Sequence, residues 1–160
     1  LSLIIGFSMV ILFMLYKYKI FGFIANIALI TNLFFLIGIL TLFEATLTLP
    51  GIAGIILTVG MAVDANVLIY ERIKEEIKQE KNKIIAFDRG YTKSRTTIID
   101  ANVTTLIAAI ILFFMGSGPI KGFSVTLGVG IITSLISVYF ISRTLTVLYL
   151  LKNKKKENII

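Results

Sequence analysis

Long apolar segments alternate with short polar ones along most of the chain. Five apolar segments approach or exceed the roughly 20 residues that a helix needs to cross a bilayer. They cover residues 1–16, 23–43, 49–70, 97–115 and 122–151. None alternates between apolar and polar positions as membrane strands do, so each is predicted to be a helix. The pattern predicts an all-α membrane protein: a multi-helix transmembrane bundle with five spans, forming one transmembrane domain over residues 1–160.

The longest polar segment, residues 71–96, is predicted to be a loop on the cytoplasmic side. Its first half, ERIKEEIKQEK, is predicted to continue the third span into water as a helix. Its second half, IIAFDRGYTKSR, mixes apolar and basic residues, which favours a short interfacial turn that returns the chain to the membrane. The alternative for this second half is a plain solvated connector.

Basic residues mark one side of the predicted bundle. The chain has 16 Lys and Arg against 9 Asp and Glu, which gives a net charge of +7. If consecutive gaps between spans alternate in side, every basic residue except Lys121 falls on one side, which the positive-inside rule assigns to the cytoplasm. The C-terminus, with its run KNKKKEN, is then cytoplasmic and anchors to anionic membrane lipids. The net positive charge is explained by the orientation of the helices in the membrane, so no nucleic-acid partner is predicted.

Two copies of the sequence Asp-Ala-Asn-Val carry the candidate chemistry, beginning at Asp64 and Asp100. Asp64 is the one charged residue in the stretch 51–70, and a carboxylate at such a depth costs about 2.5–3.5 kcal/mol on insertion scales. A charge kept at this cost suggests that it takes up protons, binds ions or holds a helix partner. By helical rise, Asp64 lies about 12 Å and Asp100 about 7–8 Å inside the cytoplasmic edge. Both are therefore expected at similar depth, facing one internal cavity.

Asp64 and Asp100 are interpreted as a proton relay. Desolvation and a nearby like charge both favour the protonated form of a carboxylate, so such a pair can load a proton from one side and release it to the other. Two structural alternatives stay open. A helix N-terminus could stabilise Asp100, since span four is predicted to start at about residue 97. Asp64 could be an anchor paired with Arg143, although Arg143 could instead snorkel to the interface.

Polar neighbours are expected to support the two carboxylates. Asn66 and Asn102 lie about 200° around their helices from Asp64 and Asp100, so they are expected to hydrogen-bond neighbouring helices. Polar groups on two sides indicate that these helices are surrounded by protein and not by lipid. The predicted supporting set also includes Thr104, Thr105 and Arg143.

Several features missing from the chain narrow its chemistry. There is no Cys and no His, which excludes thiolate sites and the commonest metal ligand and leaves proton chemistry to carboxylates. No Gly-rich phosphate loop with a following Lys-Ser/Thr is present, so ATP hydrolysis is not expected. The sequence predicts no catalytic residue, no metal site, no cofactor and no enzymatic activity.

The segments around the two repeats resemble a known family. LTLPGIAGIILTVGMAVDANVLIYERIKEEI and TTIIDANVTTLIAAIILFFMGSGPIKGFSVTLGVGIITS are similar to the fourth to sixth membrane segments of the SecD/SecF family of bacterial translocase subunits, on its SecD branch. The resemblance covers nearly the whole chain, and the paired Asp-Ala-Asn motifs are highly specific. It implies half of a resistance–nodulation–division (RND) type transporter. It places Asp64 at the membrane carboxylate implicated in proton use, and Asp100, Asn66 and Asn102 at neighbouring motif positions.

The resemblance also implies a function, partners and further parts. Family members have six spans and a large extracytoplasmic domain between the first two; here the first span and that domain are expected to be absent, and a start at Leu1 fits a fragment. The implied function is that of a Sec translocase accessory subunit of the bacterial cytoplasmic membrane, which uses the proton motive force to assist export of unfolded polypeptides. Implied partners are SecF, the SecYEG channel and the translocating polypeptide. The alternatives are an RND-superfamily efflux or lipid transporter, and a structural scaffold for the channel.

Overall fold

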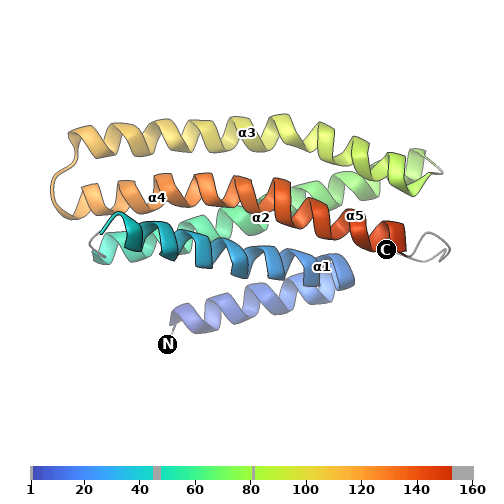
Figure 1. Cartoon of the computed structure of the whole chain (residues 1–160), viewed down its shortest axis with the longest axis horizontal. Helices are drawn as coiled ribbons and strands as arrows, with labels where there is room; N and C mark the ends of the chain where they lie inside the picture. The colour runs from blue at the N-terminus through green and yellow to red at the C-terminus, as the bar shows by residue number, and fades with distance from the viewer. Residues whose placement is uncertain (1, 45–47, 81, 153–160) are drawn as a thin grey trace.

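A computed structural model describes residues 2–44, 48–80 and 82–152 of the chain. Within these ranges it consists of helices without any strand: α1 Ser2–Leu42, α2 Leu49–Gln79, α3 Lys83–Met115, α4 Pro119–Ile136, the π-helical segment η1 Ser137–Ser142, and α5 Arg143–Lys152. Figure 1 shows them side by side in an elongated bundle, with α4, η1 and α5 joined into one long helix. The all-α membrane bundle that the sequence predicts is confirmed.

The predicted count of five separate spans is corrected to four helices that are long and apolar enough to cross a membrane. The first two predicted spans, 1–16 and 23–43, are the two arms of α1, which reverses direction at Lys19, where φ is 49° and ψ is −114°. Figure 1 shows the two blue arms folded back on one another. Gly22 permits the tight reversal, because a Cβ at this position would overlap the backbone carbonyl of Met14.

α2 and α3 form a long helical hairpin that replaces most of the predicted loop 71–96. α2 continues to Gln79, which confirms the predicted helical extension over ERIKEEIKQEK as far as that residue. The predicted interfacial turn over IIAFDRGYTKSR is wrong, because α3 begins at Lys83 and continues through this segment. Asn82 starts α3 by accepting a hydrogen bond from the N–H of Ile84 at 3.1 Å, as Asn commonly does at a helix N-cap.

Apolar and charged contacts join the two arms of this hairpin. Gly90 lies so close to Ile73 that a Cβ at position 90 would overlap the Ile73 side chain and backbone. Further toward the membrane on α3, the ammonium of Lys93 donates to the carboxylate of Glu76 at 2.7 Å. Because α2 and α3 are antiparallel neighbours, the close contact of Gly90 with Ile73 fixes which of their residues lie at the same level.

α2 packs on α4 through contacts between glycine and threonine. A Cβ at Gly54 would overlap the Thr126 side chain, and one at Gly130 would overlap that of Thr58. The Thr58 hydroxyl donates to the carbonyl of Gly54 at 2.8 Å within its own helix, so the contact buries no unpaired hydroxyl. Close approach over small residues is a main way in which helices pack in lipid. Gly60 on the same helix takes no part in this contact, because a Cβ there would meet nothing within 4 Å.

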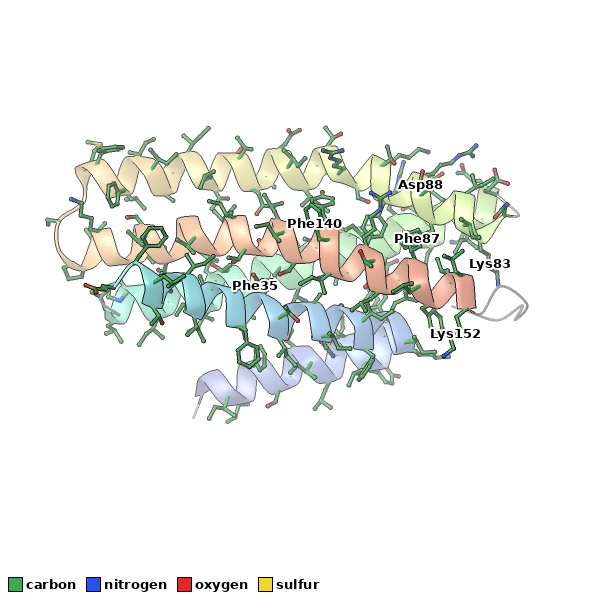
Figure 2. All side chains as sticks on the ribbon, in the orientation of Figure 1. Phe35, Lys83, Phe87, Asp88, Phe140 and Lys152 are labelled. Atoms are coloured by element: carbon green, nitrogen blue, oxygen red, sulfur yellow. The ribbon has the colours of Figure 1, made fainter. Side chains whose placement is uncertain are left out.

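The two ends of the bundle differ in charge. The reversal in α1, the α2–α3 hairpin and the end of α5 lie together at one end, which we call the basic end. Figure 2 shows Lys83, Asp88 and Lys152 near this end. Lys121 lies near the start of α4, at the opposite end. The described basic residues thus have the separation between two ends that the sequence predicts. The basic run 154–156 lies outside the described residues.

Candidate functional site

Asp64 and Asp100 lie at the same level on neighbouring antiparallel helices. α2 and α3 meet where Gly90 packs on Ile73. Asp64 precedes Ile73 by nine residues and Asp100 follows Gly90 by ten, so at the helical rise both lie about 14–15 Å from this contact. This agrees with the similar depth expected from the sequence.

Both carboxylates lie on the outside of the bundle. Asp64 and Asp100 are exposed, whereas Asn66 and Asn102 are only 2% and 6% exposed. Two residues turn a helix by about 200°, so burying the amides directs the carboxylates outward. The expectation that both carboxylates face a cavity inside this bundle is therefore wrong. They share a level on its outer surface.

The outer face of α2 around Asp64 is apolar. Leu57 and Leu68 are 46% and 42% exposed, and Gly60, one turn from Asp64, has open space around it. Within the described ranges neither Asp64 nor Asp100 has an ion pair or a side-chain hydrogen bond. The same ranges bring no three acidic side chains together as a metal ligand set. A carboxylate left unpaired at this depth is costly in lipid, so this face needs polar surroundings that the described residues do not provide.

The structural alternatives for the two carboxylates fail on this geometry. Asp100 does not lie at a helix N-terminus, because α3 begins at Lys83 and the dipole effect is confined to the first turn. Arg143 does not pair with Asp64: its guanidinium donates to Oδ1 of Asp88 at 3.0 Å, at the basic end. The Arg143 side chain is 49% exposed there, in line with the snorkelling alternative. Arg143 is therefore not one of the residues that support Asp64, contrary to the prediction from the sequence.

Asn66 belongs to a buried chain of hydrogen bonds that joins α2 to η1. Its Nδ2 donates to the carbonyl of Ala62 at 3.0 Å, and its Oδ1 accepts from the Ser142 hydroxyl at 2.9 Å. The Ser142 hydroxyl also lies 3.2 Å from the hydroxyl of Tyr70, which is 3% exposed. A buried network whose members are paired holds two helices in a defined arrangement. The interhelical hydrogen bond expected for Asn66 is present.

Ser142 and Tyr70 are members of the site that the sequence reasoning missed. Tyr70 closes the third apolar segment and resembles an interfacial aromatic residue. Ser142 is one of several small hydroxyl residues in the last apolar segment; the others buried there include Ser124, Thr126, Thr133, Ser134 and Ser137. Nothing in the spacing distinguishes Ser142 from these. Ser142 is recognised only in the structure, where it is the last residue of the π-helical segment η1. π-Bulges frequently occur at functional sites.

The other predicted polar residues, Asn102, Thr104 and Thr105, make hydrogen bonds within α3 itself. Asn102 donates from Nδ2 to the carbonyl one turn earlier at 2.7 Å, and its buried Oδ1 has no partner in the described part of the chain. The hydroxyls of Thr104 and Thr105 donate to the carbonyls of Asp100 and Ala101 at 2.8 and 3.0 Å. These bonds join no second helix. Thr104 and Thr105 therefore act locally, on the turn of α3 that carries Asp100.

The sequence matches one family over most of its length. Residues 1–153 match the family described as protein export membrane protein SecD/SecF, C-terminal. Over 142 residues, or 89% of the chain, it is 53% identical to the protein translocase subunit SecD of Magnetococcus marinus and 54% identical to that of Calditerrivibrio nitroreducens. The aligned part makes up 27% and 28% of these two relatives.

Two solved structures share the fold. One is the crystal structure of SecDF, a translocon-associated membrane protein from Thermus thermophilus, with a TM-score of 0.92 at 38% identity over 97% of this chain and 22% of that one. The other is SecDF in a super-membrane-facing form, with a TM-score of 0.88 at 38% identity over 97% of this chain and 21% of that one. The chain thus spans between 21% and 28% of the length of these relatives.

Proposed function

The chain belongs to the SecD/SecF family of protein export membrane proteins, and we propose that it is the proton-using membrane part of a SecD-type translocase subunit. In this proposal it couples proton flow across the bacterial cytoplasmic membrane to the export of unfolded polypeptide. SecF supplies the facing helical half, and the SecYEG channel carries the polypeptide. The basic end of the bundle and the C-terminus lie in the cytoplasm, as the positive-inside rule expects.

The observation that carries this proposal is the outward, unpaired position of Asp64. Asp64 and Asp100 lie level with one another, and their helices turn both carboxylates away from the interior of this chain. Polar residues at membrane depth normally face a bundle interior or a water-filled cavity. A second helical half placed against this face, as expected for SecF, encloses both carboxylates in an internal cavity between the halves.

The proposed mechanism is a change of charge at Asp64 that favours one of two bundle arrangements. Protonation removes the negative charge and with it the attraction to polar groups on the facing half. A proton moving down 100 mV supplies about 2.3 kcal/mol, enough to shift a two-state equilibrium roughly fiftyfold. Asn66 lies two residues from Asp64 and is bonded to Ser142. A movement of the Asp64 turn is therefore passed to η1 and the last helix.

Export measured with and without an uncoupler tests the proposal in the full-length protein with its partners. Asp64→Asn is expected to abolish the part of export that depends on the proton gradient, while membrane insertion and co-purification with SecF stay unchanged. Asp88→Asn is the matched control, because it removes an exposed carboxylate at the basic end. If Asp64→Asn retains export that is as sensitive to the uncoupler as the wild type, the protein is a scaffold or the relay lies elsewhere.

A further inference from the structure

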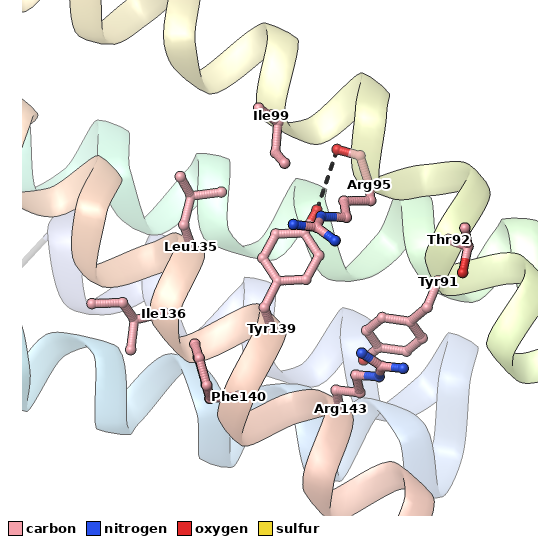
Figure 3. A pocket seen from close by; sticks show the side chains of 9 residues that line it. All are labelled: Tyr91, Thr92, Arg95, Ile99, Leu135, Ile136, Tyr139, Phe140 and Arg143. Carbon is pink, nitrogen blue, oxygen red and sulfur yellow. Dashed lines mark hydrogen bonds between the residues drawn. The ribbon is translucent and has the colours of Figure 1, made fainter.

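A pocket of about 420 Å³ opens between α3 and the last helix, and neither Asp64 nor Asp100 is among the residues that line it. Figure 3 shows its two walls: a stretch of α3 around Arg95, and the end of α4 with η1 and the first residue of α5. The Tyr139 hydroxyl donates to the backbone carbonyl of Arg95 at 3.4 Å and joins the walls at mid-height. The function proposed above assigns no ligand to this pocket.

Both walls change from apolar to basic in the same direction. On α3, Ile99 lies on the side of the bundle centre, and Arg95 lies one turn nearer the basic end. On the facing wall, Ile136 lies toward the centre and Arg143 two turns nearer the basic end. The two helices are antiparallel, so this common gradient arises from two sequences that run in opposite directions. The pocket therefore has an apolar inner half and a cationic mouth.

The cationic mouth is open to an added anion. Arg95 is exposed and has no acidic partner in the described part of the chain. Arg143 lies with its guanidinium carbon 5.8 Å from the centre of the Tyr91 ring and pairs with Asp88. The side chains of this pair are 49% and 65% exposed, and ion pairs so accessible to water contribute little stability. An anion between the two arginines can therefore replace Asp88 at little cost.

We propose that this pocket binds one anionic phospholipid from the leaflet at the basic end. Its phosphate lies between Arg95 and Arg143, and an acyl chain extends along Ile99 and Ile136 toward the bundle centre. Basic pockets between transmembrane helices on this side of a membrane commonly bind such head groups. A soluble anion leaves the apolar half of the pocket unused, and an apolar solute leaves the two arginines unused. A lipid uses both.

The position of the pocket links the lipid to the polar centre of the bundle. Tyr139 and Phe140 line the pocket and belong to η1. The same π-helical segment ends with Ser142, which bonds to Asn66 on α2. A lipid held against η1 therefore rests on the element that is tied to the Asp64 turn. Lipid composition is expected to affect the stability of this part of the protein.

Native mass spectrometry of the full-length protein, released from nanodiscs of phosphatidylglycerol and phosphatidylcholine in equal amounts, tests the proposal. We expect retained phosphatidylglycerol to exceed phosphatidylcholine by at least about fivefold, and the double variant Arg95→Gln/Arg143→Gln to lose this preference. The control Lys78→Gln/Lys152→Gln removes the same charge from the same end outside the pocket and keeps it. Ile136→Trp fills the inner half and lowers lipid retention with both arginines in place.

Any of the following results would overturn the proposal. The first is equal retention of the two lipids by the wild type. The second is a preference that survives in the arginine double variant as it does in the control. The third is that inorganic phosphate displaces phosphatidylglycerol at equal concentration, or that a photocrosslinker at Phe140 captures a protein and no lipid; either assigns the pocket to another ligand.

Discussion

The hydroxyl of Ser142 donates a hydrogen bond of 2.9 Å to Oδ1 of Asn66 in the buried centre of the bundle. Asn66 is separated from Asp64 by a single residue, and Ser142 ends the π-helical segment η1. One buried bond thus connects the turn that carries an outward carboxylate with the last helix. The proposed coupling depends on this connection.

Ser142→Ala is expected to destabilise the protein by about 1–2 kcal/mol, because it leaves Oδ1 of Asn66 buried without a donor. The free energy of unfolding of the full-length protein in mixed micelles measures this. Thr31→Val is the control, since within the described ranges the exposed Thr31 hydroxyl bonds only to its own helix. The double variant Asn66→Leu/Ser142→Ala should lose less than the sum of the two single variants. Strict additivity would show that the bond carries no coupling.

Gly130→Ala is expected to destabilise the α2–α4 contact by about 1–3 kcal/mol, because the added methyl group meets the Thr58 side chain. Thr58→Ala in the same chain should recover part of the loss by removing the clashing atoms. Gly38→Ala adds the same methyl group where nothing lies within 4 Å, so it should be neutral or slightly stabilising. Equal melting temperatures for the Gly130 and Gly38 variants would argue against the close contact.

Glu76→Gln is expected to loosen the α2–α3 hairpin. The Glu76 side chain is 4% exposed and accepts from Lys93 at 2.7 Å, with Arg72 at 3.6 Å. Glu75→Gln is the matched control, because Glu75 is 59% exposed and, among the residues that the structure describes, pairs only with Arg72 at the surface. Limited trypsin digestion should cleave the hairpin faster in the Glu76 variant than in the Glu75 variant. Identical digestion rates would assign the hairpin's stability to its apolar contacts alone.

Single cysteines on the outer face of α2 should crosslink to SecF in the assembled complex. The chain contains no Cys, so Leu57→Cys and Leu68→Cys introduce the single thiols of this part of the protein, one on either side of Asp64. Phe34→Cys is the control, on α1 and 73% exposed, and should not form this crosslink. If both α2 positions react with lipid-soluble reagents but never with SecF, the facing half does not cover Asp64.

The sequence carried most of the information about the fold, and the reason is physical. A helix must satisfy its own backbone in lipid, so the lengths of the apolar runs were enough to predict an all-α bundle. The geometry of the reversals was harder to predict. Lys19 signals a break in α1, but a tight reversal needs the contact of Gly22 with Met14, which spacing does not encode. The amphiphilic stretch after Asn82 continues as helix because the hairpin supports it with contacts such as Gly90 on Ile73.

The candidate site could be predicted from the sequence only in part, for a similar reason. The offset of about 200° correctly separated Asp64 from Asn66, because helical periodicity is a local property. Which of the two faces the bundle depends on tertiary packing. Asn66 turns inward, where Ser142 pairs with it, and Asp64 turns outward as a consequence. The facing half in the proposed function would supply the contacts that mark this polar face as an interface, and those contacts lie outside this sequence.

The most direct test of the account is whether Asp64 changes its protonation state when a proton gradient is applied. Infrared difference spectroscopy on the full-length protein with SecF, labelled with ¹³C-aspartate, detects a carboxylic acid as it forms. If Asp64 takes up the proton, a carboxyl band appears with the gradient, disappears in Asp64→Asn and persists in Asp88→Asn. A band that is unchanged in Asp64→Asn, or no band at all under a gradient that drives export, would contradict it.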